Sequence, residues 1–212
     1  MTAPSFAAYL GVTFVLVVTP GASTAVVIKN TLGGGRASGI ASAAGAALGN
    51  TIYAVASGLG LAVLFFRWSS APRALGIAGA MYFVWLGGSS LLRAWRNPNP
   101  VRDVPDRRQS MSGDRHPGES FRQGVGVNLL NPAIASFYLS IVPSFIPAGA
   151  SWWYFAGLGA SHVSMAFVCH SAWALALHRT RHVFERRSSR RALDALAGVT
   201  MLLLAVRVLR QA

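Results

Sequence analysis

Charged residues are scarce in this sequence: Asp, Glu, Lys and Arg make up only 12% of its 212 residues. A soluble globular domain typically carries about 25%. Hydrophobic residues make up 53% of the chain, and the mean hydropathy is +0.45. So little charge does not cover a water-exposed surface, so the composition predicts that much of the surface faces lipid.

Cysteine and lysine are nearly absent. Cys169 is the only cysteine, which excludes an intrachain disulfide and any Cys-x-x-Cys redox or metal pair. The net charge of +13 comes from 18 arginines and one lysine, Lys29. These residues lie between apolar runs and lack the interleaved aromatic side chains that stack on bases, so the sequence predicts no nucleic-acid partner.

Long apolar runs are what the chain does have. Spanning a bilayer takes about 20 apolar residues as helix, and six stretches meet or nearly meet this length. They are residues 5–28, 37–66, 74–92, 124–146, 151–177 and 192–209. The first has no basic residue before it and runs on past any cleavage site, so we expect a retained helix and not a signal peptide. The predicted fold class is an all-α membrane protein with six transmembrane helices.

Proline interrupts two of these stretches at corresponding places, Thr19-Pro20-Gly21 and Asn131-Pro132. Proline removes a backbone donor, and freed backbone groups are tolerated in lipid only where protein buries them or where they line a polar cavity. Aligning Pro20 with Pro132 also matches the order of the flanking stretches. This pattern predicts two inverted three-helix repeats, residues 1–92 and 122–212, joined by a linker at 93–121, as in many secondary transporters.

Basic residues are distributed unevenly between alternate loops. The loops after the first, third and fifth stretches carry 15 of the 19 Lys and Arg residues, and the other side carries four. The positive-inside rule then places the Arg-rich loops 93–121 and 178–191 in the cytoplasm and both termini outside. If the first stretch is re-entrant, five spans remain and the amino terminus is inside. The charge count does not separate these alternatives.

Acidic side chains are absent from the deep part of every predicted span. The six acids are Asp103, Asp106, Asp114, Glu119, Glu185 and Asp194. A site for a cationic side chain would place a carboxylate near the midplane, because an unpaired cation is costly there. The sequence therefore argues against a substrate with a cationic side chain and favours a neutral, polar site.

The two breaks supply polar groups for such a site. We expect substrate-binding groups at these positions: Thr19, Pro20, Gly21 and Ser23 in the first break, Asn128, Asn131 and Pro132 in the second, and Asn50 in the second span. A half-helix that starts after the first proline directs free N–H groups at a carboxylate, and the carbonyls freed before it suit an ammonium. Two alternatives stay open: prolines that only kink a helix satisfied by a Ser or Thr hydroxyl, and an asparagine that only links helices.

Histidine is the remaining ionisable group. His162 lies well inside the fifth span and is the candidate for proton coupling; a neutral, hydrogen-bonded histidine is the alternative. His178 and His182 have i,i+4 spacing but no acidic or cysteine partner, so no metal site is predicted, and no cofactor either. Ser161 and His162 are adjacent, so their side chains diverge on a helix, and the chain is not predicted to be an enzyme. A homodimer stays open.

Several motifs, in order, resemble the LysE/RhtB family (lysine exporter / homoserine–threonine exporter type). The segments that carry the resemblance are Val18-Thr19-Pro20-Gly21, Gly33-Gly34-Gly35-Arg36, Tyr82-Phe83-Val84-Trp85-Leu86-Gly87, Phe121-Arg122-Gln123-Gly124, Asn128-Leu129-Leu130-Asn131-Pro132 and Val142-Pro143-Ser144-Phe145-Ile146.

The resemblance covers nearly the whole chain and implies a secondary exporter in the bacterial inner membrane, driven by an ion gradient expected to be protons. The basic-amino-acid branch is expected to have acids in its helices, which this chain lacks. The chain is therefore more similar to the branch for small neutral amino acids or derivatives of the homoserine/threonine type. An exporter of another small metabolite or of a metal ion, or a non-transporting membrane protein, are the alternatives.

Overall fold

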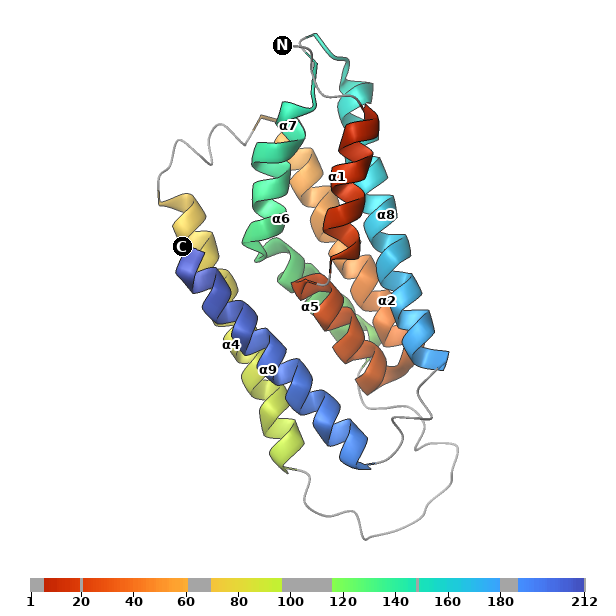
Figure 1. The fold of residues 1–212 in the computed structure, drawn as a ribbon, viewed down its shortest axis with the longest axis vertical. Helices are drawn as coiled ribbons and strands as arrows, with labels where there is room; N and C mark the ends of the chain where they lie inside the picture. The colour runs from red at the N-terminus through yellow and green to blue at the C-terminus, as the bar shows by residue number, and fades with distance from the viewer. Residues whose placement is uncertain are drawn as a thin grey trace.

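The computed structural model describes residues 6–19, 21–60, 70–96, 116–147, 149–179 and 187–211, and all regular secondary structure in these ranges is helical. The elements, in chain order, are α1 (Phe6–Val18), α2 (Ala22–Gly58), α4 (Ala71–Arg96), α5 (Pro117–Leu129), α6 (Pro132–Ser136), the π-helical turn η1 (Phe137–Ile141), α7 (Val142–Ser144), α8 (Trp152–Arg179) and α9 (Arg187–Gln211) (Figure 1). The prediction of an all-helical fold is confirmed for the described residues.

Three helices, α2, α4 and α8, are long and apolar enough to cross a membrane. A fourth candidate is a bent pair, α5 with the segment Pro132–Ser144, whose two parts meet at 55°. The apolar helix α1 has only 13 residues, about 20 Å of helix, which is shorter than a bilayer core of about 30 Å. The described helices thus give three or four candidate spans by length and composition, and the arrangement as six spans stays a prediction.

α2 folds back on itself at Gly35, whose φ of 75° and ψ of −173° are not helical. Glycine adopts a positive φ readily because it has no Cβ. The two arms, 22–34 and 36–58, lie side by side, since Asn30 Nδ2 donates a hydrogen bond to Ser42 Oγ at 2.6 Å. In Figure 1 the first arm continues in the general direction of α1, and the second arm runs back.

α5 packs closely on the second arm of α2. The Ser42 hydroxyl donates to the Ser120 carbonyl at 2.9 Å. A Cβ added at Gly45 would collide with the Phe121 carbonyl oxygen, and one added at Gly124 would collide with the Ser42 carbonyl oxygen. Small residues let helix backbones approach each other in this way. The Gly- and Ala-rich composition of the second arm therefore sets its distance from α5.

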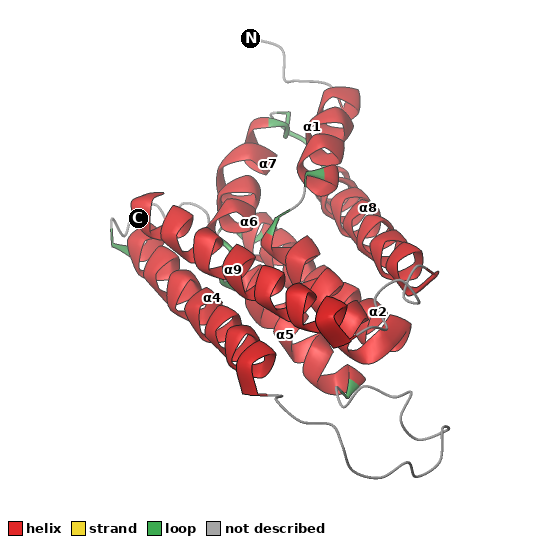
Figure 2. Cartoon of the chain, turned by 60° about the horizontal axis from the view of Figure 1, so that its bottom comes forward, coloured by secondary structure: helices red, strands yellow, loops and turns green. Residues whose placement is uncertain are grey.

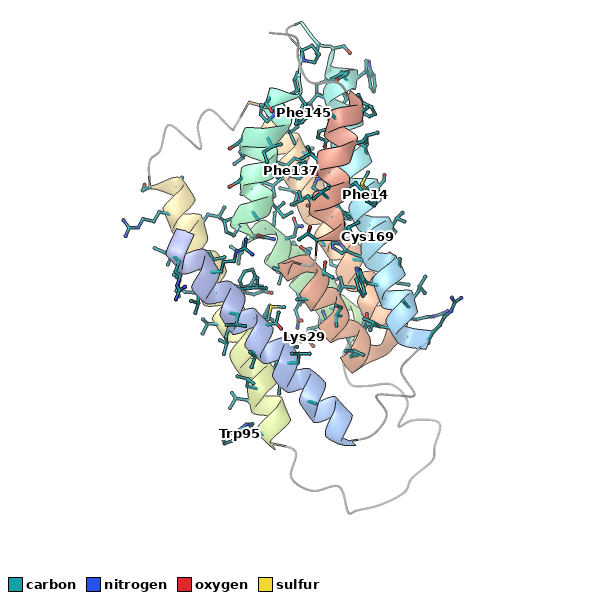
Figure 3. All side chains as sticks on the ribbon, viewed as in Figure 1. Phe14, Lys29, Trp95, Phe137, Phe145 and Cys169 are labelled. Atoms are coloured by element: carbon teal, nitrogen blue, oxygen red, sulfur yellow. The ribbon has the colours of Figure 1, made fainter. Side chains whose placement is uncertain are left out.

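The remaining helices flank this centre. α4 and α9 pack together on one side, α1 and α8 lie on the other, and α2, α5 and the α6–α7 segment lie between them (Figures 1 and 2). One buried apolar cluster includes Phe83 of α4 and Met201 of α9. A second includes Tyr9 of α1 with Phe137 and Phe145. Figure 3 shows these two phenylalanines between the α6–α7 segment and α1.

Large apolar side chains also point outward along the long helices. The exposed fraction is 65% for Val168 of α8, 79% for Trp153 of α8 and 65% for Leu203 of α9. Phe14 and Trp95 lie on the outside of the helices as well (Figure 3). Apolar exposure on this scale is costly in water and is expected where the outer surface faces lipid.

Candidate functional site

Two interruptions of the helical backbone border one cavity of about 440 Å³. The first lies between α1 and α2, the second between α5 and α6, and Figure 1 shows both near the middle of the molecule. Seven of the eight predicted substrate-binding residues line this cavity: Thr19, Gly21, Ser23, Asn50, Asn128, Asn131 and Pro132. Pro20, the eighth, lies outside the described residues. Residues more than a hundred positions apart in sequence thus meet at one site, although their role in binding stays a prediction.

The first break leaves the amino-terminal end of α2 without a side-chain cap. The N-cap residue is Gly21, in an extended conformation, and it has no side chain to accept from the first N–H groups. The Thr19 hydroxyl donates instead to the Val15 carbonyl of the preceding turn at 2.7 Å. Ser23 is 7% exposed, and its hydroxyl has no hydrogen-bond partner among the described residues. The polar groups that this break leaves for a ligand are therefore on the α2 side.

The second break is capped from within the chain. Asn131 Oδ1 accepts a hydrogen bond from the Ala133 N–H at 3.1 Å, which is an N-cap for α6. The Leu129 carbonyl, left without a helical partner by the break, accepts from the Tyr53 hydroxyl at 2.6 Å. The Leu130 carbonyl lies so close to Gly79 of α4 that a Cβ would not fit. The Asn131 amide oxygen is thus already used by the backbone.

Asn50 and Asn128 form a buried amide pair between α2 and α5. Asn128 Nδ2 donates to Asn50 Oδ1 at 3.0 Å, and the two residues are 0–1% exposed. Gly49 makes room for the Asn128 side chain. Asn128 Oδ1 has no partner in the described part of the chain. The pair therefore links helices and lines the cavity, and one acceptor of the pair, Asn128 Oδ1 beside Gly49, is left without a partner in the described chain.

His162 lines the cavity from α8 and is 1% exposed. Its ring is held by two aromatic contacts: Phe137 meets it edge-on at a centroid distance of 4.7 Å, and Tyr138 stacks on it at 5.1 Å. The π-helical turn η1 presents these two rings. Its Tyr138 carbonyl accepts from the Ser57 hydroxyl of α2 at 2.6 Å. His162 Nδ1 has no partner among the residues described.

Sequence reasoning did not place the other lining residues at the site, and Phe83, His170 and Arg207 are among them. Phe83 of α4 belongs to the motif segment 82–87, to which no site role was assigned, and no site role was assigned to His170 either. Arg207 of α9 was only one of the four basic residues on the side opposite the Arg-rich loops, yet it lines the cavity. A signal was present for His170, because His162, Ala166 and His170 lie four residues apart on one face of α8. No comparable pattern singles out Arg207.

Metal ligands are not gathered in the described part of the chain. No group of three or more His, Cys, Asp or Glu side chains there could hold a metal ion. The donors and acceptors named above could bind a carboxylate or an amide in the cavity. Two imidazoles that line it, those of His162 and His170, could take up and release a proton.

Comparison with known proteins gives a consistent result. Residues 14–212 match the family model described as LysE type translocator. The chain is 31% identical over 144 residues to the uncharacterized membrane protein YrhP of Bacillus subtilis, covering 67% of this chain and 68% of that protein. It is 32% identical over 146 residues to the homoserine/homoserine lactone efflux protein of Salmonella typhimurium, covering 69% of this chain and 66% of that protein.

A leucine efflux protein of an Enterobacter strain is 26% identical over 148 residues, which cover 69% of this chain and 66% of that protein. The chain thus spans slightly less than two thirds of the length of the two relatives named for efflux. No solved structure matches it. The family match covers nearly the whole chain, includes both breaks and agrees with the membrane-type helices, and on this evidence the chain belongs to the LysE type translocator family.

Proposed function

We propose that the protein is a secondary active exporter of small neutral amino acids or their derivatives, of the homoserine/threonine type, coupled to protons. The observation that carries this proposal is that both helix breaks, with their amide and hydroxyl groups, border one cavity near the middle of the molecule. The family match and the relatives named for homoserine, homoserine lactone and leucine efflux support the same class of transport.

The architecture proposed is six crossings in two inverted three-helix repeats. The crossings are α1 with 22–34, then 36–58, α4, α5 to α7, α8 and α9. Two matched hydrogen bonds support the repeat. Tyr53 donates to the Leu129 carbonyl, and the Cys169 thiol lies 3.7 Å from the Val17 carbonyl. Each acceptor lies three residues before one of the two prolines, and each donor comes from the central helix of the opposite repeat.

The orientation proposed places the Arg-rich loops in the cytoplasm of a bacterial cell whose inner membrane holds the protein. The helix ends that flank these loops belong to α4, α5, α8 and α9, and they lie at the end of the molecule opposite the start of α1 (Figure 1). The basic residues would then face the cytoplasmic leaflet, as the positive-inside rule requires. This arrangement supports the six-span alternative over a re-entrant first segment.

In the proposed cycle, the cavity opens alternately to the two sides of the membrane, and the broken helices hold the substrate between them. Asn128 offers an acceptor, Ser23 a hydroxyl, and the start of α2 backbone donors. His162, with His170 on the same face, carries the proton that moves opposite to the substrate.

An efflux assay tests the function. Cells that express the protein are loaded with neutral amino acids, and the compounds released to the medium are compared with those of cells carrying an empty vector. We expect faster release of at least one small neutral amino acid. Unchanged release across the whole panel, with the protein present in the membrane, would contradict the proposal.

The same assay tests the site. Asn128→Ala removes the amide at the cavity, and we expect up to about a tenfold loss of export, since one hydrogen bond between uncharged groups is worth about 0.5–1.5 kcal/mol. Thr51→Ala is the matched control, because Thr51 is exposed on α2, does not line the cavity, and donates its hydroxyl hydrogen bond to the Ala47 carbonyl of its own helix. Export by Asn128→Ala at the control rate, with equal amounts of protein in the membrane, would refute the assignment.

A further inference from the structure

The cavity that both breaks border, called the central cavity below, has a positively charged side chain in its described lining and no negatively charged one. Arg207 is the only charged side chain among the described residues that line it, and no carboxylate lines it there. Glu119, the acidic side chain of α5, accepts a hydrogen bond from Gln123 and is not among the residues that line the cavity. A substrate ammonium would therefore meet only neutral acceptors, whereas a substrate carboxylate would meet a guanidinium.

The start of α2 adds positive potential on a second wall. Its N-cap, Gly21, provides no side-chain acceptor, whereas Asn131 fills that role for α6. The amino-terminal end of a helix carries partial positive charge and free N–H groups. Ser23, in the first turn of α2, lines the cavity and is 93% buried, and its hydroxyl has no partner in the described ranges. Buried polar groups are hydrogen-bonded as a rule, so this hydroxyl is available to a ligand in the cavity.

A smaller cavity of about 210 Å³ adjoins this wall and contains the chain's only lysine. It shares Gly21, Thr24 and Leu204 with the central cavity and is also lined by Lys29. Lys29 is 3% exposed and lies on the first arm of α2 (Figure 3). Both cavities along this arm therefore have a cation in their lining and no acid among their described lining residues.

We propose that the site recognises the carboxylate of its substrate, held between Arg207 of α9 and the start of α2 at Ser23, and that the substrate's amino group is dispensable. This inference rests on the proposed exporter function and specifies its substrate class: small monocarboxylates, which include neutral amino acids, N-acylated amino acids and hydroxy acids. Charge-assisted hydrogen bonds from a guanidinium and from backbone N–H groups are the strong contacts that such a carboxylate needs.

Three related compounds separate carboxylate from amine recognition. Threonine carries both groups, N-acetylthreonine keeps only the charged carboxylate, and threonine methyl ester keeps only the ammonium. Their effect on the melting temperature of the purified full-length protein and their transport into proteoliposomes are measured. We expect threonine and N-acetylthreonine to bind and to be transported, and the ester to do so at least about tenfold more weakly.

Arginine variants locate the contact. Arg207→Gln is expected to weaken binding of N-acetylthreonine by about tenfold or more, and Arg207→Lys to retain part of it. Arg210→Gln is the matched control, because Arg210 lies on the same helix and is exposed like Arg207, but it borders neither cavity. Equal binding by Arg207→Gln and the control would overturn the role of Arg207.

The outcomes separate this inference from the proposed function. Transport of threonine and its ester but not of N-acetylthreonine overturns carboxylate recognition and leaves the exporter function standing. Binding and transport of none of the three compounds, by protein that is folded and reconstituted, overturns both.

Discussion

At the scale of single residues, the polar groups of the two breaks have different tasks. Thr19 and Asn131 bond to the backbone of their own segments, at 2.7 and 3.1 Å. Ser23 and Asn128 each keep a buried oxygen without a partner in the described chain. A list of polar residues near a proline does not distinguish these groups. The distinction matters because only an unsatisfied group gains a full hydrogen bond when a substrate enters.

His162 is the residue for which we predict a pH effect. In a proton antiporter, export should become faster when the external medium is made more acidic, since protons enter as substrate leaves. His162→Gln keeps a polar side chain of similar length but does not titrate, so we expect export by this variant to lose its response to external pH. Initial export rates measured over a range of external pH check this.

His116→Gln serves as the control, because His116 is exposed at the start of α5. His170 and Arg207 also line the cavity, and Tyr138 stacks on the His162 ring. A normal pH response in His162→Gln together with its loss in His170→Gln would move the proton site to His170 and remove His162 from that role.

At the scale of elements, caps and small residues determine where the half-helices end and how closely they pack. Proline at the first turn and asparagine at the N-cap give α6 a defined start. Gly35 permits the reversal of α2, and Gly45 and Gly124 permit its contact with α5. The course of the backbone that borders the cavity is therefore fixed by a few prolines and glycines and by one capping asparagine.

Asn131 is predicted to act mainly through the cap. Asn131→Ala should lower the stability of the protein by about 1 kcal/mol and reduce export. Asn131→Ser retains a hydroxyl that caps a helix, so we expect it to restore most of the melting temperature. If the serine variant melts like the alanine variant, capping is not the role of Asn131. If it is stable but does not export, its amide contacts the substrate.

Gly45→Ala tests the close packing of α2 on α5. The added methyl group would meet the Phe121 carbonyl oxygen, and overpacking typically costs about 1–3 kcal/mol. For a chain of this length we expect a fall of several degrees in melting temperature, about 2–4 °C for each kcal/mol. Gly157→Ala on α8 is the control, since nothing lies within 4 Å of an added Cβ there. Equal melting temperatures of the two variants would show that α5 yields at this contact.

The helices and their breaks could be predicted from the sequence, whereas the positions of several side chains at the cavity could not, for a physical reason. Apolar length identified the helical segments, and proline identified the breaks, because both signals are local. The stacking of Tyr138 on His162 and the position of Arg207 in the cavity depend on how distant helices are rotated about their axes. Neither residue type nor spacing fixes that rotation, so neither the contact of Tyr138 with His162 nor the place of Arg207 in the cavity lining was predicted.

At the scale of the whole molecule, the described helices form two flanking pairs around a centre made by α2, α5 and the α6–α7 segment (Figure 2). Matched contacts before each proline support a repeat, and the side chains exposed along the long helices are apolar. The fold class was readable from composition, because a chain with 12% charged residues has few other ways to cover its surface.

The number of crossings is tested by finding on which side of the membrane the amino terminus and the loop 93–121 lie. Cys169→Ser removes the only cysteine, and Thr2→Cys or Ser112→Cys then introduces one site for a membrane-impermeant thiol reagent. For six crossings we expect Thr2→Cys to be labelled in intact cells and Ser112→Cys only after permeabilisation. Labelling of both only after permeabilisation would indicate five crossings with a re-entrant first segment.

The relay of hydrogen bonds from Asn30 through Ser42 to the Ser120 carbonyl has a mechanical consequence. All three residues are 0% exposed, so pulling the arms of α2 or α5 apart would leave several polar groups unpaired in a dry interior, at a cost of about 1–3 kcal/mol each. We therefore expect the two arms of α2 and α5 to rotate together as one rigid body. Binding of the ligand and the change in which side of the membrane the cavity opens to would then occur in a single motion.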